Sequence, residues 1–420
     1  MLNTTGSNNT AIGRSALGAN TTGGNNVAVG RVSLDANTTG DKNTAVGNGT
    51  LSASNADNNT AIGYDALALS TTGANNVSVG YFALRSNTTG AENVAIGALS
   101  LYSNTTASNN TAVGRESLEA NTTGGQGVAV GRKALESNTT GDNNTAVGHY
   151  ALGANTTGGN NIAIGRDSLG ANTTASNNTS VGYFALASNV SGSGLAAFGQ
   201  GALQNNTASN NTALGAVTLQ ANTTGDANTA VGRSALTLNT TGVRNTAVGA
   251  YALDAVTTSD QNTAVGYNAL TANTTGTYNT AVGAAALESH TTGNRNSAFG
   301  RASLNNNTTG EDNTGIGYYA LVQNTTASDN TAVGSNALRY NTTGYSNLAV
   351  GKNALHDNTT GFQNVALGQG ALYENETTTL NVAVGYQALE ENKAEKNTAV
   401  GGYALTDNTT GTQNVAIGYG

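Results

Sequence analysis

A short segment ending in glycine recurs along the whole 420-residue sequence, and this repeat constrains the possible folds more than any other feature. Each copy contains a variant of Asn-Thr-Ala-Val-Gly, and the closing glycine marks the register of 25 copies. Of the 24 intervals between these glycines, 21 are 17 residues long and three are 16. Self-similarity at a fixed period is the signature of a solenoid, in which each copy packs on its neighbours. We therefore expect residues 1–420 to form a single continuous repeat array.

The consensus of the repeat is N-T-A-V-G-x-x-A-L-x-x-N-T-T-G-x-x, with positions numbered 1 to 17. Position 4 is always Val, Ile, Leu or Phe, position 9 is Leu in every complete copy, and positions 3 and 8 hold small residues. Alternation of this kind is typical of β-strands, and no apolar stripe of helical period is present. The pattern predicts an all-β protein with strands at positions 1–5 and 7–10, and with the position-4 residue and the Leu in the core.

The three shorter copies indicate where a loop lies. In each of them the missing residue comes from the segment around Asn-Thr-Thr-Gly, as in residues 206–210. Loops tolerate deletions, whereas a strand that loses one residue turns its side chains to the opposite face. Positions 12–17 are therefore expected to form a loop. The glycines at positions 5 and 15 are expected to supply the positive φ angles of tight corners.

A unit with two short strands suits one coil of a parallel β-solenoid, or β-roll, of about 25 rungs. Equivalent residues then stack in rows. Asn occupies position 1 in 23 of 25 copies, with interruptions at Gly127 and Leu195, and stacked Asn amides can hydrogen-bond along such a row. The chain has no Pro, which agrees with this fold because Pro lacks the N–H that a strand paired on both sides donates.

The small residues at positions 3 and 8 have two explanations. They leave room for a neighbouring backbone, which predicts chains associated side by side, most simply as a homotrimer. Alternatively, they merely fit the tight interior of a single solenoid. The array shows no polar terminal caps, so we expect rods that join end to end into filaments or that belong to a longer fibre.

Composition and charge exclude several classes of partner. The net charge of −8 and the pI of about 4.8 do not suit binding to nucleic acid or to anionic membranes. No apolar run approaches the ~18 residues needed for insertion into a membrane as a helix. Cys is absent, so we expect no disulfide and no thiolate metal site.

Residues suited to catalysis or metal binding do not gather in the sequence. His149, His290 and His356 fall at repeat positions 6, 12 and 10 and so form no common row. Acidic residues occupy variable positions, as expected for a solvated face. No Asp recurs at a fixed position as in a calcium-binding nonapeptide, and no phosphate-binding loop motif occurs. We therefore expect no catalytic residue, no metal site and no cofactor.

Position 6, directly after the corner glycine, is the most distinctive variable site. Seven of the eleven Arg and seven of the sixteen Tyr residues lie there. Both residue types are enriched at binding hot spots, and Tyr faces suit sugar rings. The alternative is that these bulky side chains only cover the corner and stack on each other. The candidate contact edge consists of Arg14, Arg31, Tyr64, Tyr81, Arg115, Arg132, Arg166, Tyr183, Arg233, Tyr267, Arg301, Tyr318 and Tyr386.

Several copies carry a resemblance to known repeats. Residues 26–30, 93–97 and 381–385, which read Asn-Val-Ala-(Val/Ile)-Gly, resemble the head repeats of trimeric autotransporter adhesins. The fuller unit at residues 262–270 is similar to repeats in tail-fibre-domain proteins of phages and bacteria. The resemblance implies a trimeric parallel β fibre and does not identify a receptor.

Together these features predict a structural or adhesive fibre segment, extracellular and located on a cell surface or a virion. Its expected partners are further copies of itself and a cell-surface glycan or protein receptor, held by repeated weak contacts. The alternative function is ice binding, because regular Thr rows can match a lattice, although the paired Thr residues lie in the loop that suffers deletions. An enzyme on this scaffold requires a charged cluster that breaks the repeat, and the sequence shows none.

Overall fold

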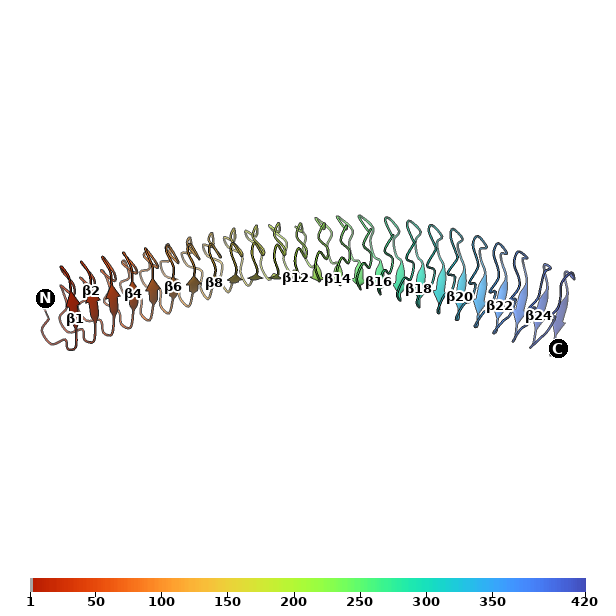
Figure 1. Cartoon of the computed structure of the whole chain (residues 1–420), viewed down its shortest axis with the longest axis horizontal. Helices are drawn as coiled ribbons and strands as arrows, with labels where there is room; N and C mark the ends of the chain where they lie inside the picture. Colours follow the sequence, from red (N-terminus) through yellow and green to blue (C-terminus); the bar gives the residue numbers. More distant parts are fainter. Residues whose placement is uncertain (1–2) are drawn as a thin grey trace. The chain divides into compact units, whose positions relative to one another are not determined.

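The computed structural model describes residues 3–420, and its regular secondary structure there consists of three-residue β-strands without a helix. Contacts within the chain separate two compact units, one ending at Asn210 and the other spanning Asn211–Gly420. The expected all-β class is confirmed. Figure 1 shows the strands as arrows that follow one another in chain order.

One strand falls at positions 2–4 of every repeat. The first unit contains β1 (Thr10–Ile12), β2 (Val27–Val29), β3 (Thr44–Val46), β4 (Thr60–Ile62), β5 (Val77–Val79), β6 (Val94–Ile96), β7 (Thr111–Val113), β8 (Val128–Val130), β9 (Thr145–Val147), β10 (Ile162–Ile164), β11 (Thr179–Val181) and β12 (Ala196–Phe198). The second contains β13 (Thr212–Leu214), β14 (Thr229–Val231), β15 (Thr246–Val248), β16 (Thr263–Val265), β17 (Thr280–Val282), β18 (Ser297–Phe299), β19 (Thr314–Ile316), β20 (Thr331–Val333), β21 (Leu348–Val350), β22 (Val365–Leu367), β23 (Val382–Val384), β24 (Thr398–Val400) and β25 (Val415–Ile417).

Within each unit, successive strands pair in parallel and in register, so that each residue stacks on its counterpart in the next copy. Thr246 pairs with Thr263 and Val248 with Val265, for example. The register also survives two of the 16-residue intervals, where Thr44 pairs with Thr60 and Val382 with Thr398. The missing residue is therefore absorbed outside the strand, which confirms a parallel β-solenoid with its deletions in the loop.

The inward face of the strands is the reverse of the one expected. In β10 the central Ala163 is fully buried, whereas Ile162 and Ile164 on either side are each 40% exposed. The same arrangement recurs along both units, so the prediction of a buried position-4 aliphatic was wrong. The interior of each coil is narrow, and a Leu from position 9, such as the fully buried Leu169, fills most of it.

The small residues at positions 3 and 8 line that same interior. Ala83 and Ala95 are fully buried, and the Ser100 hydroxyl donates to the Gly97 carbonyl at 2.8 Å, closing the corner beside it. The explanation that these residues fit the tight interior of a single solenoid is therefore confirmed. Positions 3 and 8 carry no argument for a neighbouring chain.

The prediction of a second strand at positions 7–10 was also wrong, because this segment is a series of turns. The Leu at position 9 has a positive φ, +51° at Leu152, and so does the residue at position 7, +56° at Tyr150. The left-handed conformation is costly for ordinary L-residues. It turns the chain while the Leu points inward, and bonds to the next rung continue, as in Leu152 N–H to Ser168 O at 3.0 Å.

The two recurrent glycines have different roles. At position 5 the φ angle is positive, +131° at Gly97, and a Cβ there would lie 2.5 Å from the Gly114 carbonyl oxygen. This glycine was predicted correctly. The glycine at position 15 has no such angle, and Ala takes the same place in other copies, as at Ala107, Ala175 and Ala327, so a positive φ was wrongly expected there.

Two buried rows of Asn connect the rungs of each unit. In the position-1 row, Asn26 Nδ2 donates to Gly40 O at 2.8 Å and Asn26 Oδ1 accepts the Asn43 N–H at 2.9 Å. In the position-12 row, Asn37 Nδ2 donates to Asn20 Oδ1 at 3.0 Å. The first row was predicted from the sequence. The second, an amide-to-amide ladder, was not.

Removing one amide from the position-1 row should destabilise the fold. Asn279 Oδ1 accepts the Asn296 N–H at 2.9 Å, and Asn279 Nδ2 donates to Gly293 O at 2.9 Å. Asn279→Ala leaves both backbone groups buried without these partners, at about 1–3 kcal/mol per group. We expect urea denaturation to show a loss of about 2 kcal/mol or more. The exposed amide variant Gln369→Ala is the control, and equal stability of the two variants would contradict the role of the row.

The left-handed turn predicts a stabilising substitution. Val32 is β-branched and sits at position 7 with a φ of +51°, where Asn is better tolerated. Val32→Asn should raise the free energy of unfolding by about 1 kcal/mol, since the left-handed conformation costs an L-residue roughly 1–2 kcal/mol. Val29→Asn, in the extended strand of the same rung, should lower it. Thermal denaturation checks both, and the opposite order of melting temperatures would refute the assignment.

Candidate functional site

The Arg and Tyr residues of the candidate contact edge are all exposed. Each follows the position-5 glycine, whose positive φ turns the chain so that the next side chain points away from the coil. The first unit carries the edge residues from Arg14 to Tyr183, and the second carries those from Arg233 to Tyr386. The structure therefore places the predicted residues in one solvent-facing row within each unit.

Neighbouring residues of this edge contact one another. The Tyr64 and Tyr81 rings stack with centroids 5.6 Å apart, and the Arg166 guanidinium lies 5.8 Å from the centroid of the Tyr183 ring. Such contacts agree with the interpretation that bulky side chains cover the corner. They leave Tyr267 58% exposed, so the edge also presents aromatic surface to solvent.

A second surface was missed because its residues were expected in the core. The outward strand face, defined as positions 2 and 4 of every rung, consists of Thr, Ser, Ala, Val, Ile, Leu and Phe without a charged residue in any of the 25 copies. Its aliphatic members are half-buried or exposed, as at Val128 and Val130. The restriction of position 3 to Ala, Ser or Gly was the signal that could have revealed this face, since a position that is always small indicates the tight side of a strand.

Hydroxyl groups follow one part of the outward strand face. Along β13–β20 position 2 is Thr212, Thr229, Thr246, Thr263, Thr280, Ser297, Thr314 and Thr331. The Thr residues at position 13 are engaged differently, because their hydroxyls donate to the next rung, as in Thr240 Oγ1 to Thr257 O at 2.9 Å. A hydroxyl row therefore lies on the strand face, in addition to the exposed Thr residues at position 14 of the loop, such as Thr241.

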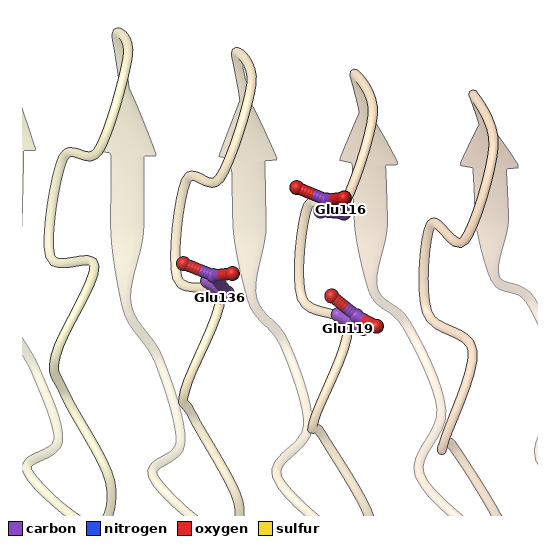
Figure 2. A group of neighbouring side chains, drawn as sticks. All are labelled: Glu116, Glu119 and Glu136. Atoms are coloured by element: carbon purple, nitrogen blue, oxygen red, sulfur yellow. The ribbon is translucent and has the colours of Figure 1, made fainter.

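Three carboxylates gather on two adjacent coils of the first unit. Figure 2 shows Glu116 and Glu119 on one coil and Glu136 on the next, and their oxygens lie within 4.8 Å of one another. Lys133 Nζ lies 2.7 Å from a Glu136 oxygen and 3.6 Å from Glu116 Oε2, and Arg115 Nη2 lies 2.6 Å from Glu116 Oε1.

Burial, followed by the charges of Glu116 and Glu136, raises the pKa of Glu119. Among the described residues these glutamates are the one group of three or more with the spacing to hold a metal ion. The ammonium of Lys133 and the guanidinium of Arg115 already neutralise two of the three charges. The arrangement is therefore an ion-pair network of the chain itself.

The histidines lie apart, as their repeat positions predicted, and one of them replaces an Asn of the position-12 row. His290 is fully buried, with Nε2 2.8 Å from Gly293 O, so Nε2 carries the proton. Its Nδ1 lies 3.2 Å from Asn307 Nδ2 and accepts from that amide. A neutral imidazole thus substitutes for one amide of the ladder.

Comparison with known proteins yields no match, either to the model of any known family or to a curated protein. In the described residues, no helix has the length and apolar character to cross a membrane. Functional inference therefore rests on the surfaces of the fold.

Acidification should destabilise the chain through His290. Burial lowers the pKa of this imidazole below its ordinary value of 6.5. The unfolded chain then binds the proton more readily, so stability is complete above pH 6.5 and falls as the pH drops toward the folded pKa. The melting temperature of the wild type should fall more between pH 7.5 and pH 5 than that of His290→Asn, which restores the amide row. Identical pH profiles would show that the buried imidazole does not control this loss.

Proposed function

We propose that this chain is a structural segment of an extracellular fibre, of the adhesin or tail-fibre-shaft kind, whose copies pack side by side through the outward strand face. The observation that carries the proposal is the absence of charge from that face in all rungs. Monomeric soluble proteins rarely expose large continuous apolar patches, and such patches mark interaction sites. A face of this kind, repeated at every rung, suits a partner with the same period, which is a second copy of the chain.

The assembly that best fits this face is a homotrimer, in which three copies turn their strand faces toward a common axis. A closed cyclic ring places the same face of every copy at an interface, so that no copy keeps an unpaired strand face. The resemblance of the Asn-Val-Ala-Val-Gly segments to adhesin heads supports the same assembly. The position-6 edge lies outside the strand face and stays available in such a fibre.

Adhesion by the fibre would use many weak contacts at once. Arg and Tyr side chains recur along the edge, and binding at one rung raises the effective concentration at the next. A stiff array with regularly spaced groups therefore serves as a spacer and as a multivalent surface on a cell or a virion. The proposal includes no catalytic step and no cofactor.

Charge placed on the strand face should dissociate the assembly. Val231, Val265 and Phe299 occupy position 4 of alternate rungs, so three Lys residues there do not adjoin one another. The triple variant Val231→Lys, Val265→Lys, Phe299→Lys should be a monomer by light scattering after size exclusion, where the wild type has the mass of a trimer.

The matched control changes the edge residues of the same three rungs, Arg233→Ser, Tyr267→Ser and Arg301→Ser. This variant should keep the mass of the wild type and lose binding to cells. A monomeric wild type at about 100 µM, or a Lys variant that stays associated, would overturn the lateral packing.

The hydroxyl row of β13–β20 favours one second candidate, an ice-binding solenoid. Eight consecutive rungs place Thr or Ser at position 2 of an uncharged face, next to an aliphatic row at position 4. Regular hydroxyl and methyl groups of this kind can order water on a surface. Thermal hysteresis in the wild type that disappears in Thr246→Lys, Thr280→Lys would establish this function in place of lateral packing, and its absence from the wild type discards it.

A further inference from the structure

Position 11 changes character near the end of the sequence. In the first 17 complete copies it is Ala or Ser, with exceptions only at Leu69, Asn205 and Leu238. The next seven copies all carry larger side chains with polar groups, and these define the position-11 row: Asn306, Gln323, Tyr340, Asp357, Glu374, Glu391 and Asp407. Seven consecutive departures from a small residue are not required by the coil, which is built without them elsewhere.

The residues of this row stack one rung apart on the surface of the second unit. Their backbones join neighbouring coils, as in Gln323 N–H to Arg339 O and Tyr340 N–H to His356 O, both at 3.1 Å. At a rung spacing of about 4.8 Å, seven residues extend over roughly 30 Å. The row therefore offers a continuous polar track along one flank of the coil.

A groove of about 430 Å³ lies in the middle of the track. Side chains from positions 11 and 13 of neighbouring rungs line it, and they are Gln323, Tyr340, Thr342, Asp357, Thr359 and Glu376. The Tyr340 ring is 41% exposed. The groove thus combines one accessible aromatic ring with an amide, two carboxylates and two hydroxyls.

Residues behind the groove hold its main groups in place. The His356 ring meets Tyr340 edge-on with centroids 5.1 Å apart and stacks on Tyr373 at 4.7 Å. Its Nδ1 lies 2.7 Å from Asp357 Oδ1, and because a carboxylate only accepts, Nδ1 carries the proton. The Arg339 guanidinium lies 5.3 Å from the Tyr340 centroid. These contacts orient both the ring and the carboxylate before any ligand arrives.

The hydrogen-bonding groups of the groove are mostly acceptors. The hydroxyls of Thr342 and Thr359 donate their protons to backbone carbonyls of the next rung, at 2.9 Å in both cases, which leaves their lone pairs for a ligand. Asp357 and Glu376 add carboxylate acceptors and repel anions. A fitting ligand is therefore rich in donors, carries no negative charge and has an apolar face for the Tyr340 ring. Sugars of a neutral glycan meet all three conditions, since they carry many hydroxyls and pack C–H faces on aromatic rings.

We propose that the position-11 row and its central groove bind a neutral oligosaccharide, laid along successive rungs. This rests on the adhesive part of the proposed function and adds a specific site on a second flank to the weak contacts of the Arg and Tyr edge. The row continues on both sides of the groove, so a chain of several sugars would contact more rungs than a monosaccharide.

Isothermal titration calorimetry on the full chain tests the proposal, with chitohexaose, cellohexaose and mannohexaose as probes. At least one should bind the wild type, and Tyr340→Ala should weaken that binding roughly tenfold or more, as loss of an aromatic hot spot does. Asp357→Asn should weaken it less. Tyr278→Ala is the matched control, because Tyr278 is 58% exposed in the same unit and lies outside the groove.

Two further probes separate other ligand classes. A hyaluronan hexasaccharide, which is anionic, should not bind. Binding of hexalysine but of none of the neutral hexasaccharides would overturn the proposal in favour of a basic peptide, and so would glycan binding that survives Tyr340→Ala. Light scattering of the same samples measures the assembly state independently of glycan binding. A Tyr340→Ala variant with wild-type mass and no glycan binding supports the groove, whereas a monomeric wild type that binds the glycan refutes only the lateral packing.

Discussion

The narrow interior of each coil determines the rest of this structure. One Leu and two small residues per rung fill it, and two rows of Asn satisfy the backbone groups that the tight turns leave inside. No room remains for a second branched side chain, so the Val and Ile of the strand lie outside. The apolar strand face is therefore a direct consequence of how little space the coil encloses.

The narrow interior explains why some positions of the repeat are nearly constant and others vary. Positions 1, 3, 5, 8, 9 and 12 contact the next rung or the core, and a change at one of them affects its neighbours on both sides. Positions 6 and 11 are half-buried or exposed and are free to differ. Tyr340 and Asp357 stand where other rungs carry Ala or Ser, and Tyr267 stands where others carry Arg or Gly. The residues proposed to contact partners therefore lie at positions that the coil leaves free to vary.

The period, the parallel register, the position of the loop and the position-1 Asn row were predictable from the sequence, because all follow from which residues recur and where deletions fall. Which face of the strand points into the coil was not predictable. Alternation of Ile162, Ala163 and Ile164 assigns these residues to two faces but does not say which face is inside, and the usual preference for burying branched aliphatics gave the wrong answer. The left-handed conformation of the Leu at position 9, as at Leu152, was not predictable either, because the residue type is the same for a buried Leu in a turn and a buried Leu in a strand.

The candidate sites show the same limit. The exposed Arg and Tyr edge was predicted because position 6 follows a corner glycine, and the structure places all thirteen residues in solvent. The groove at Tyr340 was not predicted, because it depends on residues of positions 11 and 13 from adjacent rungs meeting across a turn. The contact of the buried His290 with Asn307, and the approach of Glu136 to Glu116 and Glu119, likewise join residues that are 17 to 20 positions apart in the chain.

The free energy of unfolding of Ala264→Val tests most directly whether the strand face is oriented as described. Ala264 is fully buried beside the Leu row, so two added methyl groups should overpack the interior and lower the stability by about 1–3 kcal/mol. Unchanged or increased stability would contradict the account, because it would show that position 3 faces open space and that the branched residues of the strand form the core.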